Sequence, residues 1–155
     1  MIRQVMSMNN ERKPENPAKT FLKRYRALLI QRDSLQRSID AAYERATSCT
    51  VRIKPISVSG GAGAYDRMAE DVARISDETA QLTAAKQRTE RALSEILSAI
   101  QAVPDEMQRA VLTLRYVEGL DWITLADRLG YEISNAYILH GRALWNVRRW
   151  MDKTL

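Results

Sequence analysis

The sequence predicts an all-α protein, in which a long antiparallel, coiled-coil-like helical hairpin precedes a C-terminal three-helix module with a helix-turn-helix. Two long segments carry apolar residues at alternating steps of three and four, the spacing that gathers side chains on one face of a helix. A connector that contains proline and several glycines separates these segments. The last third of the chain repeats the helical spacing in three shorter pieces, which glycines separate.

The N-terminal part begins with polar residues 1–16, for which we expect a disordered tail. The pattern changes at Ala18, and a first helix is predicted from there to about Ala46. The heptad-like form of its spacing suits packing against a partner helix. Its stripe, in which Arg32 takes one position, is formed by Phe21, Tyr25, Leu28, Leu35, Ile39 and Ala42.

A second stripe follows the same alternation over about 35 residues, which corresponds to a helix of roughly 50 Å. Polar residues weaken its middle, and polar residues at such positions often set register or oligomeric state. Because neither helix can bury its stripe alone, we expect an antiparallel hairpin over residues 17–103, either as a monomer or as a homodimer. The second stripe consists of Met68, Val72, Ile75, Thr79, Leu82, Lys86, Thr89, Leu93, Ile96, Ile100 and Val103.

Between the two helices, residues 47–64 are expected to form a flexible connector, because Pro55 and three glycines interrupt any helix there. Gly60 and Gly61 follow Ser59, as in some loops that cradle phosphate. However, no GxxxxGK[ST] motif and no strand–turn–helix context accompany them, so a nucleotide site is not expected. The residues that could form a short extended piece in this connector are Thr50, Val51, Ile53 and Ile56.

The C-terminal module is predicted over residues 104–155. Pro104 fits the first turn of a helix, since its missing N–H has no partner in that position. Gly119 is expected to end this helix, and Asp121 to cap the N-terminus of the next one. A third helix is expected to start near Ser134.

The second and third of these helices are spaced as in a helix-turn-helix, in which two helices cross steeply through a turn of three or four residues. Their close approach favours a small residue in the first helix, here Ala126. The sharp turn needs a residue that tolerates a positive φ, here Gly130 four positions later. With the apolar residues that close the small core, the predicted motif core is Leu125, Ala126, Leu129, Gly130, Ala136 and Leu139.

In such a motif the second helix enters the major groove of double-stranded DNA by its N-terminal residues. Asn135 can pair bidentately with adenine, and Tyr137 or Ile138 can touch a thymine methyl group. Arginines can contact phosphates, which fixes the register without reading sequence. The candidate DNA-binding residues are Ser134, Asn135, Tyr137, Ile138, Gly141 and Arg142, with Arg128, Arg148 and Arg149 as further phosphate contacts.

The net charge of +5 is unevenly distributed along the chain. Residues 1–65 hold 12 Lys or Arg against 5 Asp or Glu, whereas residues 104–155 hold 7 of each. Because phosphate contacts dominate affinity for DNA, a neutral module is expected to bind DNA weakly as a monomer. Dimerisation, the basic N-terminal part or RNA polymerase is expected to supply the missing affinity.

Composition also narrows the chemistry that is expected. One His and one Cys cannot form an ordinary four-ligand zinc site, and neither a metal nor a cofactor is expected. No nucleophile–base pair or carboxylate dyad stands out, so we do not expect an enzyme. The single Cys49 suits a reducing cytoplasm, and no apolar run is long enough for a membrane span.

The histidine and the tryptophans of the module are interpreted mainly as packing residues. His140 is expected to pack beside Trp145 or to bond a phosphate. Large rings are usually buried, so we expect core anchors at the three tryptophans, Trp122, Trp145 and Trp150.

The segment from Met107 to Leu144 resembles the fourth conserved region of sigma factors. The similarity lies in a Leu-Arg-Tyr element at residues 114–116, a Glu-Gly pair at residues 118–119 and the helix-turn-helix that follows. The resemblance implies a module that reads the upstream hexamer of a promoter. This chain shows nothing like the sigma region that melts the promoter, so we do not expect it to act as a complete sigma factor.

From Pro17 to about Trp150, the chain is similar to a family of small phage and prophage proteins from Gram-positive bacteria. The similarity lies in an Ala-Thr-Ser element at residues 46–48, a Ser-Gly connector and a Leu-His-Gly-Arg-Ala-Leu element at residues 139–144. This resemblance implies regulation of phage gene transcription in the cytoplasm of a bacterial host.

Three functional hypotheses follow from the sequence. The first is a transcription regulator that reads DNA through the helix-turn-helix, with RNA polymerase as a further partner. The second is a protein-interaction module that docks on polymerase or another factor without reading DNA, which the neutral charge of residues 104–155 favours. The third is a DNA-packaging protein like a small terminase subunit, for which a ring of many copies is expected.

Overall fold

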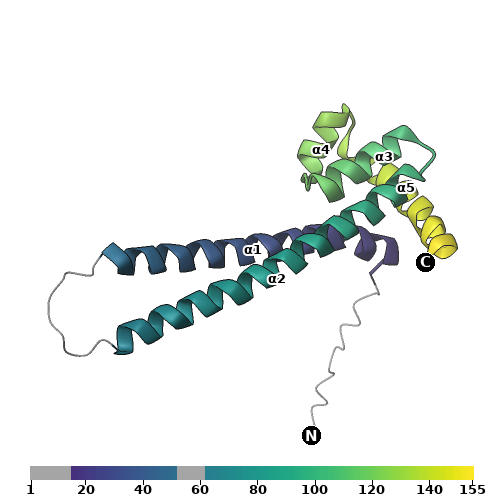
Figure 1. Cartoon of the computed structure of the whole chain (residues 1–155). Helices are drawn as coiled ribbons and strands as arrows, with labels where there is room; N and C mark the ends of the chain where they lie inside the picture. Colours follow the sequence, from purple (N-terminus) through teal and green to yellow (C-terminus); the bar gives the residue numbers. More distant parts are fainter. Residues whose placement is uncertain (1–14, 52–61) are drawn as a thin grey trace, which may run out of the picture.

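The computed structural model describes residues 15–51 and 62–155, and it confirms the all-α prediction (Figure 1). Two long helices form an antiparallel pair, and the shorter helices gather at the end where the first long helix begins and the second ends (Figure 1). The elements are α1 (Pro17–Val51), α2 (Ala62–Gln101), α3 (Glu106–Leu112), the π-helical turn η1 (Thr113–Val117), α4 (Trp122–Leu129) and α5 (Ile133–Thr154).

Helix α1 begins at Pro17, directly after the residues that were predicted to form a tail. Asn16 caps the helix, because its Oδ1 accepts a 3.0 Å hydrogen bond from the backbone N–H of Ala18. Pro17 occupies the first helical position, where the missing N–H costs nothing. Most of the predicted tail, residues 1–14, lies outside the described part of the chain.

The connector is shorter than predicted, because α1 continues to Val51 and α2 begins at Ala62. The extended conformation predicted for Thr50 and Val51 is wrong, since both are helical. Residues 47–51 contain no proline or glycine to stop the helix, and the Ser48 hydroxyl donates to the Glu44 carbonyl one turn back at 2.6 Å. Residues 52–61, with the predicted Pro55 break, lie outside the described residues.

The predicted stripe of α1 faces α2, since its members are buried or half-buried. On α2 two positions of the predicted stripe are each wrong by one residue. Lys86 is exposed, and Ala85 takes its place in the seam at 4% exposure. Similarly, Ala92 is more deeply buried than the predicted Leu93. Alanines allow the two helices to approach closely, and this preference for small residues was not visible in a count of large apolar residues.

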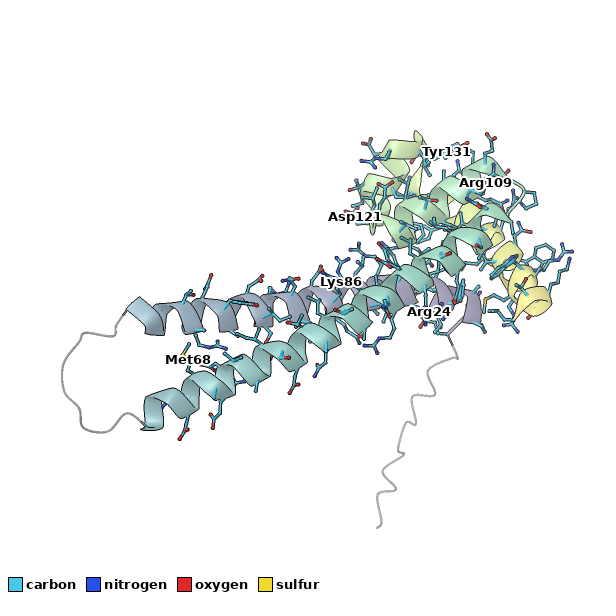
Figure 2. The ribbon with its side chains drawn as sticks, in the orientation of Figure 1. Arg24, Met68, Lys86, Arg109, Asp121 and Tyr131 are labelled. Atoms are coloured by element: carbon cyan, nitrogen blue, oxygen red, sulfur yellow. The ribbon has the colours of Figure 1, made fainter. Side chains whose placement is uncertain are left out.

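Burial decreases along the hairpin away from the shorter helices. Leu82 is 6% exposed, whereas Met68 and Val72 of the same predicted stripe are 54% and 56% exposed. Figure 2 shows Met68 near the connector end of the hairpin, whereas Arg24, which pairs with Glu95 of α2, lies toward the opposite end. The predicted seam is therefore wrong for Met68, Val72 and Thr79, whose side chains are exposed.

The hairpin and the C-terminal helices share one hydrophobic core at the base of the hairpin. The start of α1, the end of α2, the α3–η1 segment and α5 all contribute to it. This shared core fixes the orientation of the shorter helices on the hairpin. Its buried residues are Ala18, Phe21, Leu22, Ile96, Ala99, Ile100, Val103, Leu112, Tyr116, Ala143, Leu144 and Val147.

None of the helices in the described ranges combines the length and the apolar character that crossing a bilayer requires.

Candidate nucleic-acid interface

The C-terminal module starts at an aspartate that caps α3. Asp105 accepts a 2.8 Å hydrogen bond from the backbone N–H of Gln108, and α3 begins at Glu106. Pro104 precedes the cap, so its predicted place in the first helical turn is wrong. The carboxylate satisfies a free N–H at the helix start, a task that proline cannot perform.

A π-helical turn and a glycine redirect the chain from α3 to α4. The backbone N–H of Glu118 donates to the Thr113 carbonyl at 3.0 Å, and Gly119 follows with a φ of 79°. Glycine adopts this left-handed conformation without the penalty of a Cβ. Asp121 then caps α4 as predicted, accepting a 2.8 Å hydrogen bond from the N–H of Thr124.

A second glycine ends α4 and separates it from α5. Gly130 has a φ of 69°, and the N–H of Tyr131 donates to the Ala126 carbonyl at 2.9 Å, which closes the C-terminus of α4. Helix α5 begins at Ile133, so residues 130–132 form a three-residue turn. Figure 2 labels Asp121 and Tyr131, which flank α4.

A small core beneath this turn holds α4 and α5 together. Ala126 is 2% exposed and Ala136 is fully buried, so small residues occupy the helix contact from both sides. Leu125 is buried with them, and Leu129 and Leu139 are half-buried at the edge. The apolar residues of the predicted motif core therefore form one cluster, which Val111, Leu114, Leu120 and Trp122 complete, whereas Gly130 is exposed in the turn.

Alanine at either left-handed glycine is expected to destabilise the fold through backbone strain of about 1–2 kcal/mol. At Gly130 the new Cβ would meet no contact within 4 Å. At Gly119 it would lie 2.5 Å from Cζ of Arg26, the end of a flexible, exposed side chain that can move aside. Urea unfolding should therefore show a similar loss of stability in both variants. Wild-type stability of either variant would contradict this account of the two turns.

The N-terminal face of α5 is open to solvent. Asn135 and Arg142 are exposed, and their side chains have no hydrogen-bond or ion-pair partner within the described part of the chain. Tyr137 is 50% exposed and Ile138 is 54% exposed. The structure thus groups six predicted DNA-binding residues on the first turns of α5, namely Ser134, Asn135, Tyr137, Ile138, Gly141 and Arg142.

The three other predicted phosphate contacts are exposed but already engaged. Arg128 pairs with Glu118 at 2.7 Å, and Arg148 pairs with Asp152 at 3.0 Å. The guanidinium of Arg149 lies over a tryptophan ring. Because α5 rises 1.5 Å per residue, Arg148 lies roughly 20 Å along the helix from its start. The structure therefore does not bring Arg148 and Arg149 together with the N-terminal face.

The aromatic residues of the module take different places from those predicted. Trp145 is 60% exposed, so its role as a core anchor is wrong. Trp122 is half-buried, and its ring centroid lies 4.3 Å from that of Tyr137, which positions Tyr137 on the open face. The contact of Trp122 with Tyr137 was not predicted, because a 15-residue separation gives no local signal for a ring contact. Trp150 packs against the shared core.

One expectation placed His140 beside Trp145, but the structure places it elsewhere. It is buried, its Nε2 lies 2.8 Å from Oη of Tyr116, and its ring meets the edge of Trp122. Burial raises the pKa of Tyr116 to about 12, so its hydroxyl stays protonated. This buried pair braces η1 against α5 and engages Nε2 of His140.

Acid is expected to weaken the fold through His140. Burial, reinforced by Lys19 and Arg115, lowers the pKa of His140 from an ordinary 6.5 to about 4. Between these values the unfolded chain binds a proton that the folded chain excludes, so stability falls as pH drops through this window. The full loss is on the order of 3 kcal/mol. Urea unfolding at about pH 7 and about pH 4.5 measures it, and His140→Gln should remove this part of the pH dependence.

Within residues 15–51 and 62–155, no cluster of three or more His, Cys, Asp or Glu side chains is arranged to hold a metal ion. Comparison of the chain with protein-family models, with curated proteins and with solved structures gives no match.

Proposed function

We propose that the protein binds duplex DNA through α4 and α5 and thereby regulates transcription. The observation that carries this proposal is the exposed N-terminal face of α5, which the break at Gly130 separates from α4. Asn135 offers an amide that matches adenine, and Arg142 offers a guanidinium that is not engaged by the described residues. Tyr137 is held on Trp122, so it enters binding with little loss of side-chain freedom.

The resemblance of Met107–Leu144 to sigma region four supports a more specific form of the proposal. The protein would act on phage genes in a bacterial host, with RNA polymerase as a partner. Polymerase contacts would help a module whose residues 104–155 hold equal numbers of acidic and basic side chains.

Equilibrium binding to duplex DNA tests the proposal. Fluorescence anisotropy at one fixed salt concentration compares duplexes from the neighbouring genomic DNA with an unrelated duplex of equal length. We expect one genomic duplex to bind about 1,000-fold more tightly or better, as specific regulators do. Equal affinity for every duplex would contradict specific reading by α5.

A second candidate function, docking on another protein without reading DNA, is favoured by the apolar side chains on the same motif. Ile123 is 71% exposed and Ile138 is 54% exposed, and both are large apolar residues on helices of a neutral module. Sedimentation with purified RNA polymerase in the absence of DNA discriminates between the two candidates. Complex formation that Ile123→Asp abolishes, together with no specific DNA binding, would favour docking.

A further inference from the structure

A cationic cavity lies where the start of α1 meets η1 and the start of α4. Its volume is about 240 Å³, and its wall carries the side chains of Lys19, Lys23, Arg26 and Arg115. Among the described residues no carboxylate lines this cavity, although Glu15 pairs with Lys23 nearby. Glu15 offsets part of the charge of Lys19 and Lys23, but four cations against one carboxylate still favour an anionic occupant.

One of the cations is held in place by contacts that leave the cavity open, and a second lies against a glycine. Arg115 donates from Nη1 to the Leu120 carbonyl at 2.6 Å, and its Cζ lies 5.0 Å from the ring centroid of Trp122. Arg26 lies against Gly119, where a Cβ would approach its guanidinium to 2.5 Å. The glycine thus makes room for a guanidinium against the backbone. Pre-positioned guanidinium groups suit phosphate, because their planar N–H groups match its oxygens.

The size of the cavity indicates a small anionic group. Pockets for drug-sized ligands start at about 300 Å³, so this cavity lies just below their range. One phosphate group fits this space.

The cavity borders the face that we propose to read DNA. Trp122 lines the cavity as the first residue of α4, and its ring contacts Tyr137 on the open face of α5. In a helix-turn-helix bound to DNA, the first helix crosses the phosphate backbone while the second lies in the groove. A backbone phosphate is therefore the anion that would reach this cavity when α5 enters the groove.

We propose that this cavity binds a backbone phosphate of the DNA that α5 reads, an inference that rests on the proposed function. Three of its four cations come from α1 and not from the module. Helix α1 thus supplies positive charge beside a module that is neutral by itself. The shared core holds α1 in this position, so the hairpin becomes part of the DNA-binding surface.

The single histidine gives an independent readout of the cavity. Lys19 and Arg115, together with the larger effect of burial, lower the pKa of His140. An anion between these cations offsets their charge, so it is expected to raise the pKa of His140. NMR of the imidazole protons follows this change without interference from another histidine.

The test compares two double variants of the full chain that remove the same charge from the same helix. Lys19→Gln/Lys23→Gln removes two positive charges from the wall of the cavity. Arg37→Gln/Arg45→Gln removes two from exposed positions roughly 20 Å or more farther along α1. We expect the first variant to bind specific and unrelated duplexes about tenfold more weakly. Its plot of log affinity against log salt should be shallower by about 0.9, the value for one phosphate. The control should keep the wild-type slope, and both variants should keep the wild-type melting temperature.

Added DNA should also raise the pKa of His140 in the wild type but not in Lys19→Gln/Lys23→Gln. Equal changes of slope in both double variants, or no change in either, would overturn the proposal. If the wild type binds no duplex, the proposed function fails. Titration with inorganic pyrophosphate then tests whether the cavity binds free phosphate compounds instead. A pyrophosphate-induced rise of the His140 pKa would assign the cavity to free phosphate compounds. The absence of such a rise would show that the cavity binds no phosphate, and either result overturns the backbone assignment.

Discussion

Leu82→Asp is expected to unfold the hairpin. Leu82 is 6% exposed in the seam of α2, at the level where Ser38 of α1 hydrogen-bonds Glu78 across the helix pair at 3.0 Å. An unpaired carboxylate in this position loses its hydration without gaining a partner, which costs several kcal/mol. Small proteins have a total stability of about 5–15 kcal/mol, so one such change removes much of it. Circular dichroism during heating should show a much lower melting temperature or no folded state.

Val72→Asp provides the matched control, because Val72 belongs to the same predicted stripe but is 56% exposed. An exposed carboxylate remains hydrated, so we expect a change within about 0.5 kcal/mol. Comparable losses of stability in the two variants would contradict the seam described here.

Asn135→Ala is expected to weaken specific DNA binding by about 5- to 150-fold, the loss of one bidentate contact worth about 1–3 kcal/mol. Binding to unrelated DNA should remain, because the amide reads a base and not the backbone. Arg142→Ala should weaken binding to all duplexes and lower the salt slope by about one. Anisotropy titrations at several salt concentrations measure both effects.

Gln87→Ala is a suitable control, because Gln87 is an exposed amide on α2 outside the module. It should bind DNA as the wild type does. If Asn135→Ala and Arg142→Ala also bind as the wild type does, α5 is not the reading helix.

The long helices were predictable because their apolar spacing extends over many turns, but the seam of α2 was not fully predictable. The alternation of three and four residues placed Lys86 and Leu93 in the seam, whereas the structure buries Ala85 and Ala92 instead. The depth of burial depends on how closely two helices approach, and only tertiary packing determines that distance. The same limit explains why Met68 was expected to be buried.

The turn between α4 and α5 was more predictable, because local chemistry restricts it strongly. A left-handed residue is needed after α4, and Gly130 meets this need without strain. A small residue is needed at the crossing, and Ala126 meets it. The exposure of Asn135 then follows from the same helical phase that buries Ala136.

The cationic cavity could not be predicted, although its charge was visible in the sequence. The excess of Lys and Arg in residues 1–65 indicated a basic N-terminal part but not which face of a helix would meet the module. Lys19 and Arg115 are almost 100 residues apart, and only the shared core brings them to the same cavity. Local spacing carries no information about such a contact.

The central claim is that α5 reads DNA sequence through its exposed N-terminal face. Enrichment of duplexes from a random-sequence library, performed with the wild type and with Asn135→Ala/Ile138→Ala, tests it most directly. We predict that the wild type enriches one short sequence motif and that the double variant loses preference at the positions that these side chains contact. Enrichment of the same motif by both proteins, or of no motif by the wild type, would contradict the claim.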